Sequence, residues 1–97
     1  MIIAAIKVAL HFDQSRSLKQ KRSLLKSIIE KLKQRFNASV SEIEDQNLWQ
    51  KATVGITYVS LTEFQAEKNA VLIRNFIEAT GKALISRYEH EIIKIDV

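Results

Sequence analysis

The sequence predicts an α+β domain of the ferredoxin-like type, in which a four-stranded antiparallel sheet carries two helices on one face. Two observations support this prediction. Residues 2–12 alternate apolar and mixed side chains, which is typical of a strand with one buried face. Two later segments repeat apolar residues at helical spacing and give the order β-α-β-β-α-β. Right-handed crossovers then favour the strand order 4-1-3-2.

The first helix has a signal at each end. Ser17 precedes it and Gln20 follows three residues later, which is the pattern of a capping box. Asn37 tolerates left-handed backbone geometry and is expected to end the helix. The apolar positions between these ends predict the buried face, namely Leu18, Leu25, Ile28, Ile29, Leu32 and Phe36.

The rest of the chain divides at turn residues and caps. Strands are predicted over residues 40–44 and 49–61, and the even positions of the second of these should face the core. A helix is predicted from Thr62 through Thr80, with Gly81 as its stop, and a last strand over residues 84–97. The glycine inside the 49–61 strand, Gly55, predicts a bulge or a close backbone approach.

Composition limits the class of protein. With 97 residues, 46% hydrophobic and 27% charged, the chain is expected to form one domain over residues 1–97. The absence of cysteine excludes disulfides, thiolate metal sites and cysteine catalysis, and makes the cytoplasm the default compartment. The apolar segment 1–10 is too short to span a membrane and lacks the features of a signal peptide, so no membrane association is expected.

Positive charge is concentrated in one part of the chain. Residues 1–35 hold nine Lys and Arg against two acidic residues, a net charge of +7, whereas residues 36–97 hold six against nine, a net charge of −3. The first helix is therefore strongly basic, which suits a polyanion such as RNA. The alternative is a solvated helix face that keeps the domain soluble.

The start of this helix is unusual because cations there oppose the helix dipole, at a cost of roughly 0.3–1 kcal/mol each. Exposed amides and basic side chains together predict an anion or RNA-backbone site. Its candidate residues are Arg16, Ser17, Lys19, Lys21, Arg22 and Lys26, with Trp49 beside them. The competing interpretation is that Glu42, Glu44 and Asp45 pair with some of these cations and fasten the edge of the fold.

Trp49 has two interpretations. It is a candidate stacking platform for an unpaired base, but a lone tryptophan at the start of a strand is more often a lid on the core. Tyr58 and Phe64 are expected in the core or at its margin. No aromatic pair of the kind found in RNA-recognition motifs is present on a central strand.

A catalytic interpretation is weaker. His11, Asp13 and Glu44 form a possible metal or acid–base site, but their spacing matches no established motif, and a surface histidine is the better account of His11. The chain has neither a glycine-rich phosphate loop nor a nucleophile elbow. We therefore expect a non-enzymatic protein with no metal and no cofactor.

The sheet face opposite the helices is a second candidate surface. Small and apolar residues are expected there, and such faces are commonly covered by a second copy or a partner. Homo-oligomerisation through this face is therefore expected. The residues concerned are Ile3, Ala5 and Ala9, with Thr53, Gly55 and Thr57 on the adjacent strand.

Three segments resemble the YlxP-like family, which consists of small bacterial proteins of unknown function: residues 17–22, 36–42 and 48–52. The resemblance implies a ferredoxin-like fold. The family's genes often lie among those for translation initiation and ribosome maturation, which implies an RNA or ribosome partner. Where the family usually carries an acidic residue before the Leu-Trp-Gln segment, this chain has Asn47. If that acid acts as a metal ligand or general base, the function would be impaired here; if it only pairs with the basic start of the first helix, the amide can still form a hydrogen bond there.

The favoured hypothesis is a binding domain that contacts RNA or a ribosomal particle through its basic first helix. The alternative is a homo-oligomeric structural or ligand-sensing module that uses the open sheet face.

Overall fold

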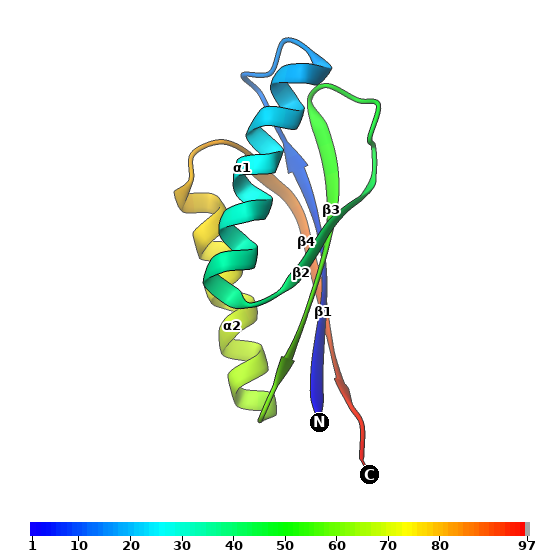
Figure 1. Cartoon of the computed structure of the whole chain (residues 1–97), viewed down its shortest axis with the longest axis vertical. Coiled ribbons are helices and arrows are strands. Elements are labelled where there is room, and N and C mark those ends of the chain that lie inside the picture. The colour runs from blue at the N-terminus through cyan, green and yellow to red at the C-terminus, as the bar shows by residue number, and fades with distance from the viewer. Residues whose placement is uncertain (97) are drawn as a thin grey trace.

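The centre of the structure is a long antiparallel sheet, seen edge-on in Figure 1 with both helices on its left. The computed structural model describes residues 1–96. Its elements are β1 (Ile2–His11), α1 (Leu18–Phe36), β2 (Ser39–Glu44), β3 (Lys51–Ser60), α2 (Glu63–Ala79) and β4 (Leu84–Lys94). The strand predicted for 84–97 therefore ends at Lys94, and Val97 lies outside the described residues.

The strand order is β2-β3-β1-β4, which is the predicted order 4-1-3-2 counted from the other edge. Every neighbouring pair is antiparallel, with Ile6 of β1 opposite Ile56 of β3 and His90 of β4. The ferredoxin-like α+β fold is thus confirmed. This topology brings the N-terminus of α1 and the β2–β3 loop to the same end of the sheet (Figure 1).

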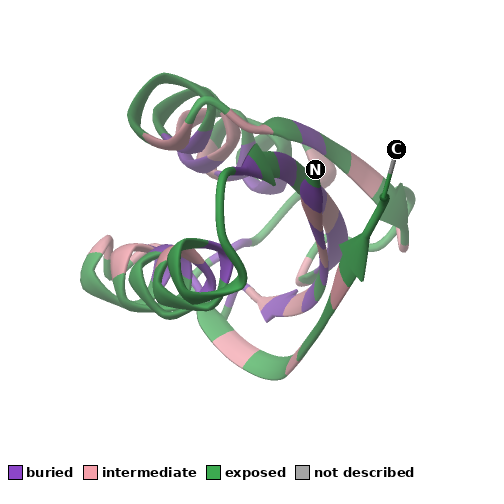
Figure 2. Ribbon diagram, turned by 90° about the horizontal axis from the view of Figure 1, so that it is seen from below, coloured by how far each residue is buried: buried purple, intermediate pink, exposed green. Residues whose placement is uncertain are grey.

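The core lies between the sheet and the two helices. Figure 2 shows buried residues on the sides of the helices that face the sheet and at intervals along the central strands. As predicted, the even positions of β1 and β3 are buried: Ile2, Ala4, Ile6, Val8, Leu10, Ala52, Val54, Ile56 and Tyr58. The helices contribute Leu25, Ile28 and Leu32 from α1, and Ala66, Ala70, Ile73 and Ile77 from α2.

The predicted helix ends are present. The Ser17 hydroxyl accepts the Gln20 backbone N–H at 3.0 Å, and the Gln20 side chain accepts the backbone N–H of Arg16 at 2.7 Å. Asn37 ends α1 in the left-handed region with φ of 48°. Gly81, with φ of 67°, follows α2 in a conformation that favours glycine.

Gly55 marks a close approach, as expected. The register of β2 against β3 shifts between Glu42 and Glu44, so Ile43 is the extra residue of a bulge. A Cβ atom on Gly55 would lie 3.3 Å from Cγ2 of Ile43. The bulge therefore folds the Ile43 side chain over the space that Gly55 leaves.

Two expectations about surfaces are corrected by the structure. Phe64 does not lie in the core or at its margin: it is in the first turn of α2 and 76% exposed. The open sheet face is less apolar than expected, because pairing with β1 places Arg87 and Glu89 of β4 beside Ala9 and Lys7. The sequence pattern of β4 did not assign its faces, so these charges could not be placed.

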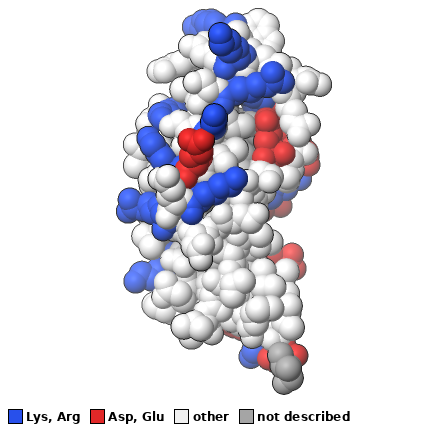
Figure 3. Space-filling view, viewed as in Figure 1, with Lys and Arg blue, Asp and Glu red and all other residues white. Residues whose placement is uncertain are grey.

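Charge is unevenly spread over the molecule. Its principal extents are 48 × 22 × 21 Å, and Figure 3 shows the Lys and Arg residues of this view gathered over the half that carries α1. The other half of the same face is almost free of charged side chains. Among residues 1–96, no helix is long and apolar enough to cross a membrane.

Candidate functional site

The first turn of α1 is positive and has no acidic residue of its own. The Ser17 cap satisfies one backbone N–H, and Arg16 donates from Nη1 to the Asp13 carbonyl at 3.1 Å. Arg16, Ser17 and Lys19 are all exposed. The cap therefore explains how the helix begins despite its charge, but it supplies no negative charge to balance the dipole.

Lys21 is the exception among the candidate cations because its side chain is completely buried. Its ammonium lies 3.0 Å from Oε2 of Glu42, within the distance of an ion pair. It also donates to the backbone carbonyls of Asp45 at 3.0 Å, Gln46 at 3.3 Å and Lys51 at 3.1 Å. We call this group of contacts the Lys21 clasp. It joins α1 to the loop between β2 and β3.

The clasp changes the interpretation of Lys21. A lysine with no exposed surface and four protein oxygens around its ammonium is unavailable to a phosphate, so the expected anion contact of Lys21 is replaced by a structural role. A sequence signal for this was available. Lys21 lies four residues before Leu25 and seven before Ile28, on the same buried stripe of α1.

The three acidic residues of the hairpin formed by β2 and β3, Glu42, Glu44 and Asp45, each have a different partner. Only Glu42 pairs with the candidate cluster, through Lys21. Glu44 pairs instead with Lys7 on the open sheet face, at 3.0 Å. The Asp45 side chain accepts from the Thr53 hydroxyl at 2.9 Å. The hairpin therefore neutralises one cation of the cluster and leaves the others.

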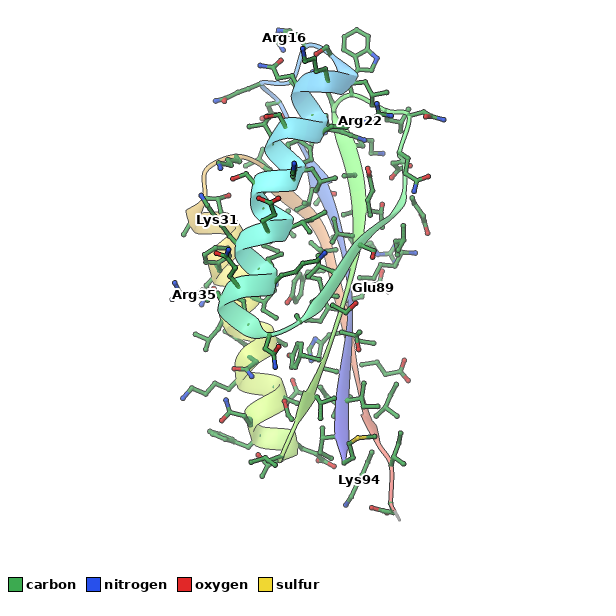
Figure 4. The ribbon with its side chains drawn as sticks, viewed as in Figure 1. Arg16, Arg22, Lys31, Arg35, Glu89 and Lys94 are labelled. Carbon is green, nitrogen blue, oxygen red and sulfur yellow. The ribbon has the colours of Figure 1, made fainter. Side chains whose placement is uncertain are left out.

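The remaining cations of α1 lie on its outer surface. Figure 4 shows Arg16 at the start of the helix and Arg22 on the side of the β2–β3 loop. Lys26 is paired only loosely, with its Nζ 4.0 Å from Oε1 of Glu30. A shallow groove of about 290 Å³ runs between α1 and β2, and it is lined by Arg22, Leu25, Lys26, Ile29, Glu30, Lys33 and Glu42.

A second basic group on the α2 side of α1 was not predicted. Lys82, just after Gly81, donates to the Ser27 hydroxyl and lies against Lys31. Desolvation, together with the neighbouring charge of Lys31, lowers the pKa of Lys82. Figure 4 shows Lys31 and Arg35 on this flank. Periodicity within one helix cannot reveal this group because Lys82 comes from a distant loop.

Trp49 does not act as a lid on the core. Its side chain is 54% exposed, and it lines a hollow of about 340 Å³ together with His11, Leu48, Gln50 and Lys51. Because Trp49 lies in the loop that the Lys21 clasp holds, it sits at the same end of the molecule as the start of α1. The structure therefore brings Trp49 to the end of the fold that carries Arg16 and Lys19.

The residues of the catalytic hypothesis do not converge. His11 pairs with Asp13 through Nε2 and Oδ1 at 2.9 Å, whereas Glu44 is engaged by Lys7. Within residues 1–96, no group of three or more His, Asp and Glu side chains is placed to hold a metal ion. The three residues therefore belong to two separate pairs, His11 with Asp13 and Lys7 with Glu44.

Comparison with known proteins identifies the family. A family model described as "Protein of unknown function (DUF503)" matches residues 3–90. The chain belongs to this family. Within it, the chain is 41% identical over 63 residues to the "Uncharacterized protein YlxP" of Bacillus subtilis (strain 168), which covers 65% of this chain and 68% of the relative. The resemblance to YlxP-like proteins is thus confirmed, and with it membership of a family whose function is not established.

A solved structure supports the fold of this DUF503 protein. A dimeric ferredoxin-like protein from an uncultured marine organism has a TM-score of 0.50 at 11% identity, over 99% of this chain and 98% of that one. The de novo designed protein Foldit4 has a TM-score of 0.49 at 14% identity, over 98% of each chain. At such low identity, the first of these supports the ferredoxin-like fold and nothing further.

Proposed function

We propose that this protein is a cytoplasmic, non-enzymatic binding domain that contacts RNA, free or within a ribosomal particle, through the basic surface of α1. We call this surface the α1 face and define it as Arg16, Ser17, Lys19, Arg22 and Lys26. Lys21 is left out because the hairpin occupies it. Trp49 lies at the edge of the α1 face.

The observation that carries the proposal is the surplus of unpaired cations. Within residues 1–96, the ion pairs of α1 are those of Lys21 with Glu42 and of Lys26 with Glu30. Arg16, Lys19 and Arg22 are exposed and have no carboxylate partner there. Unpaired cations on one helix face attract a polyanion and release its counterions on binding, whereas a merely solvated surface tolerates interspersed charges of both signs.

The proposal is tested by the anisotropy of a labelled RNA hairpin with an unpaired loop, titrated with protein at several salt concentrations. With about four phosphates neutralised by the α1 face, the logarithm of the binding constant should fall with the logarithm of salt concentration at a slope of about −3. The double variant Lys19→Glu/Arg22→Glu should abolish binding at the salt concentration where the wild type binds.

A matched control separates the position of the charges from their number. Lys68 of α2 and Lys94 of β4 are also exposed, and Figure 4 shows Lys94 at the opposite end of the molecule from Arg16. Lys68→Glu/Lys94→Glu changes the net charge by the same amount and should retain most of the binding. Equal losses in the two double variants, or no association of the wild type at low salt, would refute the proposal.

A second candidate function is self-association through the open sheet face. One end of this face carries a row of apolar residues across three strands, Val59, Ile3 and Ile93, of which Val59 is 66% exposed. A second copy would cover this row. Light scattering tests the idea: the wild type should have the mass of an oligomer and Val59→Lys that of a monomer, whereas a wild-type monomer at every concentration would refute it.

A further inference from the structure

The exposure of Trp49 has no explanation in the packing of the fold. Tryptophan is strongly buried on average, yet 54% of this side chain is exposed, and the preceding Leu48 is 45% exposed. The core at this end is closed by Phe12, which is completely buried. The indole is therefore free to contact a partner.

The hollow beside Trp49 combines an aromatic surface with polar groups. Besides Trp49 and Leu48, it is lined by the imidazole of His11, the amide of Gln50 and the ammonium-bearing side chain of Lys51. An indole provides a stacking face. Gln50 Nε2 and His11 Nε2 are engaged by the Ser15 carbonyl and by Asp13, which leaves the amide oxygen of Gln50 and Nδ1 of His11 as polar groups for the edge of a base. This combination fits a planar polar ring better than an aliphatic ligand.

Hydrogen bonds to α1 and to the segment before α1 hold the loop that carries Trp49 in place. The Lys21 clasp holds the carbonyls of Gln46 and Lys51, one on each side of Trp49. Gln50 is tied twice to the segment before α1, because its carbonyl accepts the backbone N–H of Phe12 at 2.8 Å and its amide donates to the Ser15 carbonyl at 3.1 Å. An aromatic group on a fixed loop loses little conformational freedom when it binds, which favours a preformed site.

These contacts also place the hollow beside the α1 face. Gln50, next to Trp49 in sequence, bonds to Ser15, which directly precedes Arg16. Arg16 and Lys19 are both exposed. An anionic chain lying along these cations would therefore pass the open side of Trp49. Charge of this kind favours a nucleic acid over an apolar segment of another protein.

We propose that the hollow at Trp49 binds an unpaired nucleobase, which stacks on the indole while Arg16 and Lys19 contact the neighbouring phosphates. This inference rests on the proposed function and specifies its ligand: single-stranded RNA is bound in preference to duplex. In a duplex the base faces are already stacked on one another, so only the phosphate contacts remain available.

The test uses the fluorescence of Trp49, which is the only tryptophan in the chain. Short oligouridine should quench this fluorescence as it binds. An abasic oligomer of equal length carries the same phosphates without bases, so it should bind more weakly and cause no quenching. A duplex of equal length should likewise leave the fluorescence unchanged.

Variants provide a second readout, by anisotropy of labelled oligouridine. Trp49→Ala should weaken binding about 5- to 100-fold, and Trp49→Phe should recover part of the loss. Phe64→Ala removes an even more exposed aromatic side chain from the start of α2, at the other end of the molecule, and should have no effect. Circular dichroism of each variant shows whether it is folded.

The outcomes separate the two proposals. The base site is refuted if oligouridine binds without quenching the fluorescence. It is also refuted if Trp49→Ala binds oligouridine as tightly as the wild type does, or if the wild type binds the abasic oligomer as tightly as oligouridine. In each of these cases the proposal for the α1 face still stands. If a protein partner isolated with the wild type is lost with Trp49→Ala while oligouridine binding is unchanged, the hollow is a protein-binding site and the proposal is overturned. If no RNA binds at low salt, both proposals are refuted.

Discussion

Replacing Lys21 with methionine should destabilise the fold strongly. Methionine has a similar length, so the aliphatic part of the side chain keeps its packing while the ammonium is lost. The carboxylate of Glu42 then remains in place with only 19% of its side chain exposed, and three backbone carbonyls lose a donor. The variant therefore isolates the polar part of the clasp.

The size of the effect follows from these contacts. Removing one partner of a buried ion pair costs about 3–5 kcal/mol, because the other charge is left uncompensated. Partial hydration of Glu42 lowers the cost, whereas the carbonyls of Gln46 and Lys51 raise it. We expect Lys21→Met to lower the free energy of unfolding by about 3–5 kcal/mol, a large part of the about 5–15 kcal/mol typical of a domain.

Urea unfolding followed by far-ultraviolet circular dichroism measures this loss. Lys19→Met, two residues earlier and exposed, is the matched control and should change stability by less than about 0.5 kcal/mol. The double variant Lys21→Met/Glu42→Gln should lose less than the sum of the two single variants, by at least about 1 kcal/mol. A loss below about 1 kcal/mol for Lys21→Met, or additive single effects, would refute the assigned role of the clasp.

Three further predictions concern the helix ends and the core. Gly81→Ala meets no atom within 4 Å but must adopt φ of 67°, so it should lower stability by about 1–2 kcal/mol in urea unfolding, and an unchanged midpoint would contradict the conformational argument. Ser17→Ala leaves the Gln20 N–H without its acceptor and should cost about 1 kcal/mol, whereas Ser17→Asp should retain the cap. Burial raises the pKa of Tyr58 to about 12 and also raises that of Tyr88, so the unfolded chain loses these protons first and stability should fall as pH rises from about 10 to 12. Phenolate absorbance and circular dichroism should therefore change together, and ionisation of these tyrosines near pH 10 without unfolding would be inconsistent with their burial.

Local signals in the sequence were sufficient for most of the fold. Each of these signals involves only a few neighbouring residues: the alternation of apolar residues in β1, the cap at Ser17 and the helix stop at Gly81. Together such signals predicted the order of helices and strands, and this order predicted the topology of the sheet. Phe64 was wrongly expected in the core or at its margin because it was judged by its apolar side chain and not by its position on the helix. It is two residues from the fully buried Ala66, which puts it about 200° around the helix from the buried face.

The candidate site was harder to predict because it depends on contacts between distant parts of the chain. Lys21 and Arg22 are adjacent cations with the same chemistry, and only the position of the hairpin decides that one is buried and the other exposed. Likewise, Glu44 is one residue from Asp45, yet a bulge in β2 directs it to Lys7 on the open face. Such outcomes depend on strand register, which is specified only weakly in a strand as exposed and polar as β2.

The uneven distribution of charge also affects how the protein meets a partner. Residues 1–35 carry a net charge of +7 and residues 36–97 a net charge of −3, and the Lys and Arg side chains seen in Figure 3 gather over the half that carries α1. The field of a polyanion attracts this positive half and orients the protein before contact. A larger fraction of encounters with the polyanion then occurs in the orientation that allows binding. The association rate constant should therefore exceed that of a domain with the same net charge spread evenly over its surface.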